Sequence, residues 1–439
     1  MTQVNQAPLT NRRVLNIAVP IVLANATVPL MGLVDTGVVG RLGQPEPIGA
    51  VGIGAVILTS IYWVFGFLRM GTSGLVAQSH GAGDAMESGA HLLRALAIAM
   101  AAGLAFIILQ SALFWGAFQL APTSARVEEL AREYLSIRIW GAPATIGLYA
   151  ITGWLIAVER TRAVFALQLL QNGANVVLSI WLGLWLEMGV SGVALATLIS
   201  EWSGFLLGLW MARQPLGQAL QGVSGLFAWQ KMSQLMVMNG NIMIRSVLLQ
   251  ASFTSFLFLG VAQGDVKLAA NQVLLLFLEI VAYALDGFAF AAESLVGQAV
   301  GAKRPERVRQ ASILASQWGV AGAALLSVVF WFGGGAIIDL LTTSAEVRAE
   351  ARHYLIWVAI APLIGVASWM FDGIFIGATL TKEMRNSMLI ATLIYLAAVM
   401  ILPQTFGNHG LWASLMLLNA ARGITMARRY PRAEAAAMA

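Results

Sequence analysis

Cysteine is absent from the 439-residue sequence, and charged residues make up only 11% of it. Soluble globular domains carry roughly 25% charged residues, so this shortage excludes a soluble enzyme and a disordered chain. The lack of cysteine excludes a disulfide-stabilised secreted module and a metal site with thiolate ligands. The four histidines have no metal-ligand spacing, and no glycine-rich stretch has the spacing of a nucleotide-binding loop. We therefore expect neither enzymatic activity nor a metal or cofactor.

Apolar residues are abundant instead, at 59% of the chain, and the mean hydropathy is +0.77. They are spread over most of the length, which is typical of a polytopic membrane protein. A transmembrane helix needs about 20 mostly apolar residues. On that criterion the sequence predicts an all-α protein with twelve transmembrane helices, at residues 14–40, 48–78, 92–120, 130–157, 163–186, 190–212, 231–260, 267–297, 310–339, 350–378, 386–403 and 409–427.

A polar stretch after the sixth predicted helix divides the chain. It separates an N-terminal six-helix lobe (1–213) from a C-terminal six-helix lobe (231–439), and we interpret residues 214–230 as a cytoplasmic linker. With both termini in the cytoplasm, the loops on that side hold most of the 26 Lys and Arg residues, as the positive-inside rule requires. These loops account for the net charge of +5, so we expect no nucleic-acid partner.

The two lobes repeat one another. Residues 75–82 (LVAQSHGA) recur as 295–302 (LVGQAVGA), and 133–135 (EYL) recur as 353–355 (HYL), both at a shift of 220 positions. Six helices per lobe give both lobes the same orientation in the membrane. Parallel repeats of this kind place a cavity between two bundles near the membrane midplane, so the repeat indicates a transporter.

Asp35 is the most isolated charge inside a predicted helix. A charge at the bilayer centre costs roughly 2.5–3.5 kcal/mol on insertion scales, so its presence needs a reason. The nearest basic residue along the chain is Arg41. Burial away from a cation favours the protonated carboxylic acid, and such a group can bind and release a proton. We predict that Asp35 binds the coupling proton; a snorkelling or structural carboxylate is the alternative.

Two prolines interrupt the helix that contains Asp35. Pro20 and Pro29 each lack a backbone donor, which leaves the carbonyls of Asn16 and Asn25 without their usual partners. A permanently bent helix would have the same sequence. A proline-broken helix that carries a titratable group is nevertheless what a proton-driven switch requires.

A second polar set follows in the fifth and sixth predicted helices. Gln168, Asn172, Asn175 and Ser179 have the spacing of a single helical stripe, and Thr197 lies in the next helix. The stripe either lines an aqueous cavity that binds substrate, or joins helices through polar contacts worth about 0.6 kcal/mol each. Both interpretations stay open from the sequence.

The second lobe also contains polar and charged residues within its predicted helices, namely Asn241, Arg245, Glu279, Asp286, Glu293 and Asp372. The three carboxylates of the eighth helix recur every seven residues, and seven residues make nearly two turns, so they share one face. That face lines water or pairs with Arg245. We interpret the whole set as a possible cation site or as a polar network.

These residues and their order resemble those of the multidrug and toxic compound extrusion (MATE) transporters, in particular the DinF branch. In the first lobe the resemblance rests on Pro20 and on residues 34–36 (VDT), 153–155 (GWL), 159–162 (ERTR) and 192–197 (GVALAT). In the second lobe it rests on 241–246 (NIMIRS) and, most specifically, on 286–298 (DGFAFAAESLVGQ). The motifs cover nearly the whole chain.

The resemblance implies two six-helix bundles around a V-shaped cavity, and antiport of lipophilic cations against inward H⁺ or Na⁺. In the DinF branch the aspartate of helix 1 is the protonation site and the helix bends near its proline, which implies these roles for Asp35 and Pro20. The polar network of the first lobe carries over to Asn175 and Thr197. An aspartate often found in helix 5 corresponds to Ser179, which removes one carboxylate from this lobe.

We therefore expect a proton-coupled antiporter that exports drugs or organic cations across the bacterial cytoplasmic (inner) membrane by alternating access, and so confers antibiotic resistance. We expect a monomer surrounded by membrane lipids. The alternatives are a Na⁺-coupled drug antiporter, or a flippase for lipids or lipid-linked oligosaccharides from the same superfamily. A major-facilitator porter is disfavoured because Asp84 and Glu87 occupy the loop that would carry its basic signature.

Overall fold

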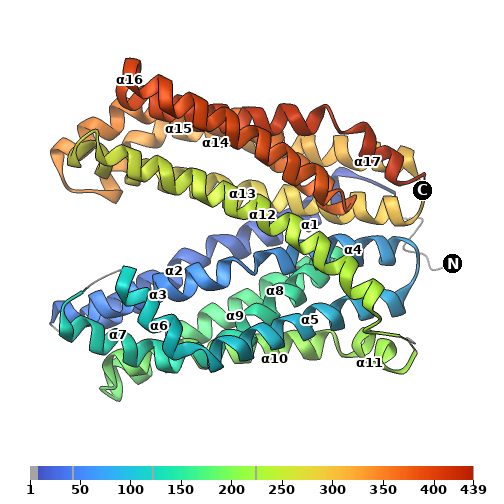
Figure 1. The fold of residues 1–439 in the computed structure, drawn as a ribbon, viewed down its shortest axis with the longest axis horizontal. Coiled ribbons are helices and arrows are strands. Elements are labelled where there is room, and N and C mark those ends of the chain that lie inside the picture. The colour runs from blue at the N-terminus through green and yellow to red at the C-terminus, as the bar shows by residue number, and fades with distance from the viewer. Residues whose placement is uncertain (1–7, 42–43, 121–122, 223–224, 439) are drawn as a thin grey trace. The chain divides into compact units, whose positions relative to one another are not determined.

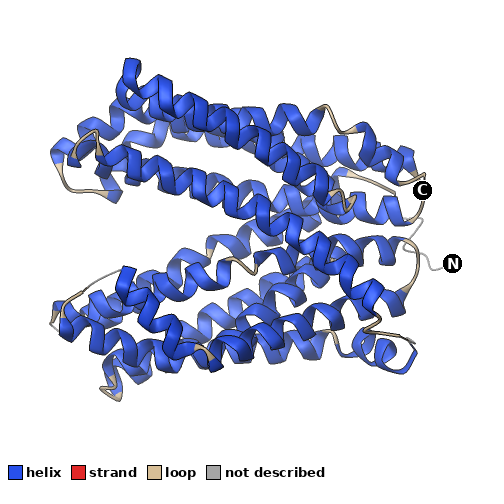
Figure 2. Cartoon of the chain, viewed as in Figure 1, coloured by secondary structure: helices blue, strands red, loops and turns tan. Residues whose placement is uncertain are grey.

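The computed structural model describes residues 8–41, 44–120, 123–222 and 225–438, and every regular element within these ranges is helical (Figure 2). Ten helical stretches in this part of the chain are long and apolar enough to cross a membrane. Their lengths follow from the long apolar runs of the sequence, because a helix satisfies all of its backbone hydrogen bonds internally in lipid. The predicted all-α membrane fold is confirmed.

Two breaks explain why ten stretches correspond to the twelve predicted crossings. The first crossing is divided into α1 (Asn11–Ala26) and α2 (Val28–Gly40), and each piece is too short to be counted alone. The last two crossings are merged in α16 (Thr381–Ala427), which Gly407 interrupts with a φ of 54°. Glycine has no Cβ and adopts this left-handed conformation without strain, so Gly407 allows the chain to break here.

The chain forms two compact units, which we call unit 1 and unit 2. Unit 1 contains Met1–Val22, Ala77–Gly83 and Met236–Ala439, and unit 2 contains Leu23–Val76 and Asp84–Leu235. Helices α1, α4 (Gly66–Gly81) and α12 (Trp229–Val261) each begin in one unit and end in the other.

Unit 2 is a bundle in which α2 packs against the next helix of the chain and against α9, while α10 packs against α7, α8 and α9. A 3₁₀ turn (Ile139–Gly141) joins α7 to α8, and a π-helical turn (Trp181–Trp185) continues α9. The predicted linker region contains a helix, α11. The remaining bounds are α3 (Pro45–Trp63), α5 (Ala85–Ile108), α6 (Gln110–Leu120), α7 (Ala125–Arg138), α8 (Ala142–Ala157), α9 (Thr161–Ile180), α10 (Gly189–Met211) and α11 (Arg213–Gly222).

Unit 1 is a second bundle, in which α15 packs against α13, α14 and α16 (Figure 1). The start of α1 and the C-terminal helix α17 lie at the same end of this unit. Arg13 donates a hydrogen bond to Gln298 near the end of α13, and α17 packs on α14, which begins there. The remaining bounds are α13 (Asp265–Gly301), α14 (Pro305–Leu341), α15 (Ala345–Gly377) and α17 (Pro431–Ala436).

Candidate coupling and substrate site

Asp35 lies on α2 and faces α9 and α10 within unit 2. Its side chain is buried, with 8% of the residue exposed, and Ser179 Oγ donates a hydrogen bond of 2.9 Å to its Oδ1. No basic side chain in the described ranges forms a salt bridge with Asp35. An ionised carboxylate has about four acceptor sites, so this burial leaves most of them without a donor.

Thr197 completes the contact on the other carboxylate oxygen. Its Oγ1 lies 3.5 Å from Asp35 Oδ2, 3.1 Å from the carbonyl oxygen of Val193, and 2.8 Å from Asn175 Nδ2. A hydroxyl group has one proton, and the shorter distance favours Val193 as its acceptor. Thr197 therefore accepts from Asn175 and holds the aspartate only weakly, so Ser179 is the main donor to Asp35.

Apolar side chains cover the neighbourhood of Asp35 along α2. Val38 and Val39 are buried in a cluster with residues of α3, α7 and α10, including Tyr134 and Val193, and Val34 packs against it. The π-helical turn after α9 presents Gly183 to Val38, where a Cβ would stand 2.6 Å from the valine side chain. This packing keeps water from one side of the carboxylate and brings α9 close to α2.

Asn172 contacts the break in the first transmembrane crossing. Its Nδ2 donates a 2.7 Å hydrogen bond to Thr27 Oγ1, and Thr27 Oγ1 in turn donates to the carbonyl of Ala24. Helix α1 ends at Ala26 and α2 restarts at Val28, next to Pro29. Pro20 lies inside α1. The helical interruption thus lies at Thr27, and one of the predicted cavity residues contacts it directly.

The structure brings together Asp35 of the first predicted helix with Ser179 and Thr197 of the fifth and sixth, and Thr197 with Asn175, although the sequence predicted no contact between Asp35 and this polar set. It places Asn172 on Thr27, about two turns from Ser179 along α9. Helical spacing was the sequence signal for the stripe on α9, and isolation of a charge within an apolar helix was the separate signal for Asp35.

A buried ion pair close to this set has no counterpart in the sequence prediction. Arg138 at the end of α7 and Glu201 on α10 form a salt bridge with an N–O distance of 2.9 Å, and both are buried. A side chain at Gly141 would overlap the Glu201 carboxylate, so the glycine leaves room for it. The signal available was two opposite charges within predicted helices, but their separation in sequence gave no reason to pair them.

Two arginines of the second lobe meet Asp372 in unit 1. Arg245 from α12 and Arg422 from α16 both form salt bridges with Asp372 on α15, the latter at 2.7 Å. Asn241 Nδ2 donates to Thr381 Oγ1 at 3.3 Å and its Oδ1 accepts from Arg385 at 2.9 Å. Arg245 thus pairs with an acid of α15.

The three carboxylates of α13 differ in their environment. Glu279 is exposed, Asp286 is half-buried and Glu293 is buried. Their shared face therefore runs from the surface of unit 1 into its interior.

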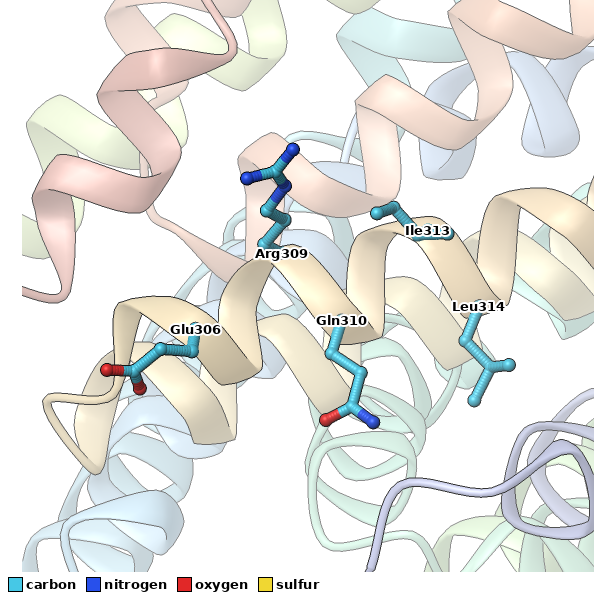
Figure 3. A pocket seen from close by; sticks show the side chains of 5 residues that line it. All are labelled: Glu306, Arg309, Gln310, Ile313 and Leu314. Atoms are coloured by element: carbon cyan, nitrogen blue, oxygen red, sulfur yellow. The ribbon is translucent and has the colours of Figure 1, made fainter.

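A shallow depression on the surface of unit 1 lies apart from these residues. It has a volume of about 290 Å³ and is lined by side chains of α14 alone, Glu306, Arg309, Gln310, Ile313 and Leu314 (Figure 3). None of the residues predicted from the sequence lines it.

The fold and the buried polar set are those of a multi-pass membrane transporter. Residues 20–181 and 242–402 match the MatE family model, and these two segments cover well over half of the chain. The chain belongs to the MatE family, as the sequence motifs had indicated.

Individual relatives agree with this assignment. The chain is 39% identical over 421 residues to "DNA damage-inducible protein F" of Escherichia coli (strain K12), covering 95% of this chain and 91% of the relative. It is 27% identical over 448 residues to "Probable multidrug resistance protein NorM" of Pseudomonas aeruginosa, covering 96% and 90%. A solved multidrug resistance MATE family transporter in an outward-facing conformation has the same fold, with a TM-score of 0.88, 19% identity and coverage of 97% and 96%.

Proposed function

We propose that this protein is a proton-coupled antiporter that exports lipophilic organic cations, drugs among them, across the bacterial cytoplasmic membrane. Membership of the MatE family and the likeness to a protein named for multidrug resistance support export of such compounds. The positive-inside distribution supports cytoplasmic termini. The observation that carries proton coupling is the buried Asp35 carboxylate with one close donor and no salt bridge among the described residues.

The chemistry of Asp35 suits reversible protonation. As a carboxylate it accepts from Ser179, and its second oxygen is only weakly contacted by Thr197. As a carboxylic acid it becomes a donor, and the Thr197 hydroxyl, already turned toward Val193, offers an oxygen that could accept. Protonation therefore changes which groups hold α2 against α9 and α10.

The first transmembrane crossing, which consists of α1 and α2, is the element that moves in this proposal. Pro20 removes one backbone hydrogen bond inside α1, and Pro29 stands at the start of α2, just after the interruption at Thr27. A change in the contacts of Asp35 alters how α2 packs, and α1 bends in response. We propose that Pro20 is the hinge, and that Asn172, Asn175, Ser179 and Thr197 line the space that substrate occupies in unit 2.

Sodium coupling is the second candidate, and one observation favours it. The amide oxygen of Asn175 is buried and has no hydrogen-bond partner among the described residues. Together with the oxygens of Asp35, Ser179 and Thr197 it forms a set of ligands that hard cations prefer. Ser179 supplies a hydroxyl where a second carboxylate would have bound a cation more strongly, and for this reason we place the proton first.

The two candidates are separated by transport of a fluorescent lipophilic cation in proteoliposomes, with a pH gradient and a Na⁺ gradient imposed separately. We expect the pH gradient alone to drive transport, and Asp35→Asn to abolish it while the folded protein remains in the membrane. Glu129→Gln is the matched control, because this acid is exposed at the surface of unit 2. Normal drug export by a folded Asp35→Asn variant would exclude the mechanism, and transport driven only by Na⁺ would establish the second candidate.

A further inference from the structure

Unit 1 contains a cluster of three buried or half-buried arginines, and only one carboxylate forms salt bridges with them among the described residues. Arg245 and Arg422 share the single carboxylate of Asp372, and both are more than nine-tenths buried. Arg385 is half-buried and donates to the amide oxygens of Asn241 and Asn386. We call these three residues the arginine cluster.

The charges around the cluster can be followed residue by residue. Asp372 is the one acid that forms a salt bridge with any of the three arginines in the described part of the chain. The nearest acid along α16, Glu383, instead pairs with Arg432 at 2.7 Å. Three guanidinium groups and one carboxylate leave the cluster itself with positive charge that no salt bridge among the described residues offsets, and an uncompensated charge inside a membrane-spanning bundle is costly.

Unused hydrogen-bond donors accompany the excess charge. Arg245 Nε is buried and has no partner among the described residues. Asn241 lies one turn before Arg245 on α12 and accepts from Arg385, so it connects the half-buried arginine to the buried pair. A guanidinium group presents a planar fork of donors that matches a carboxylate or phosphate, whereas a metal ion or an organic cation would be repelled here.

We propose that the arginine cluster binds the anionic group of an amphiphilic molecule, and that it selects among transported compounds those that carry a carboxylate or phosphate on an apolar body. The proposal rests on the export function proposed above and adds a substrate feature to it. The polar residues of the second lobe were interpreted above as a cation site or as a polar network. The proposal adopts the polar network, because two guanidinium groups already bind the carboxylate of Asp372.

The test uses a pair of dyes that differ only at the anionic group, tetramethylrhodamine with a free carboxylate and its methyl ester. Binding of each is measured by fluorescence anisotropy to the purified full-length protein in phosphatidylcholine nanodiscs. We expect Arg385→Gln to weaken binding of the free acid about tenfold or more and to change binding of the ester less than about twofold. Arg385 makes no salt bridge among the described residues, so this variant leaves the Asp372 pairs intact.

Lys382→Gln is the matched control, because it removes the same charge from an exposed position one turn away on α16. If both variants lose the same affinity for the free-acid dye, the effect is general electrostatics and the proposal is overturned. Unchanged binding of the free-acid dye in Arg385→Gln would also overturn it. Repeating the experiment with phosphatidylglycerol in the nanodiscs tests whether the cluster binds a transported compound or a lipid. If this lipid displaces the free-acid dye, the cluster binds an anionic headgroup and the proposed role in substrate selection is wrong. Transport of the ester reports on the export function independently of all these outcomes.

Discussion

Gly81 and Gly301, which are equivalent positions of the internal repeat, are each covered by the glutamine of the other copy. A Cβ at Gly81 would overlap the backbone carbonyl of Gln298, and a Cβ at Gly301 would overlap that of Gln78. Gln78 and Gln298 are themselves 220 positions apart, as are the two glycines. The two copies of the motif therefore cross each other reciprocally at the ends of α4 and α13, and the contact lies within unit 1.

Gly301→Ala should separate these two helix ends and lower the stability of the protein. Overpacking a close contact costs typically 1–3 kcal/mol, and backbone atoms cannot rotate away as a side chain can. We expect a clear decrease in the melting temperature of the purified protein. Gly333→Ala is the control, because a Cβ there meets nothing within 4 Å. Equal melting temperatures for the two variants would show that the crossing tolerates a side chain.

Breaking the ion pair between Arg138 and Glu201 should destabilise unit 2 strongly. Either single change to Gln leaves one buried charge without its partner, which lowers the free energy of unfolding by about 3–5 kcal/mol. The double variant contains neither charge, so no buried charge is left without a partner. We expect the double variant to melt above at least one of the single variants. The exposed pair of Arg126 and Glu129 serves as the control for the same set of single and double changes. There, each change should alter the free energy of unfolding by no more than about 0.5 kcal/mol. Additive effects at the buried pair would contradict this account.

The position of the bend in the first transmembrane crossing can be tested by replacing its two prolines one at a time, which restores one backbone N–H donor in each variant. Pro20→Ala allows one more hydrogen bond within α1, and Pro29→Ala supplies a donor that is used only if the helix becomes continuous across Thr27, so each change favours a straight helix. We expect Pro20→Ala to slow proton-driven export of a fluorescent cation without lowering the melting temperature. Pro45→Ala at the start of α3 is the control, because a proline there replaces no helical hydrogen bond. Slow export in Pro29→Ala alone would move the hinge to the break at Thr27.

Much of the fold could be predicted because lipid imposes simple rules on sequence. The twelve crossings follow from long apolar runs, and even the break at Gly407 lies between two predicted helices. The repeat was visible because Gly81 and Gly301 are constrained by the same contact. The residues Asp35, Ser179 and Thr197 could be selected from the sequence because isolated polar groups in apolar helices need partners, but their contacts with one another could not be predicted.

The remaining contacts depend on distances that a linear sequence does not contain. Arg138 and Glu201 are 63 positions apart and belong to no periodic pattern, so only the packing of α7 against α10 identifies them as partners. Arg245 had three acids available on α13, but the acid it meets is on α15. Both cases concern the pairing of charges, where several partners satisfy the same local pattern and tertiary structure decides among them.

Among the described residues, Asp35 is the one acid that forms hydrogen bonds with Ser179 and Thr197, and Glu201 forms a salt bridge with Arg138. On the proposed mechanism, one proton would therefore be exchanged for each substrate molecule. Exchange of a proton for a monovalent cation moves no net charge, so the membrane voltage would contribute nothing and one pH unit would sustain about a tenfold accumulation ratio. A zwitterion with its carboxylate on the arginine cluster would instead leave a net inward charge, and its export would respond to voltage.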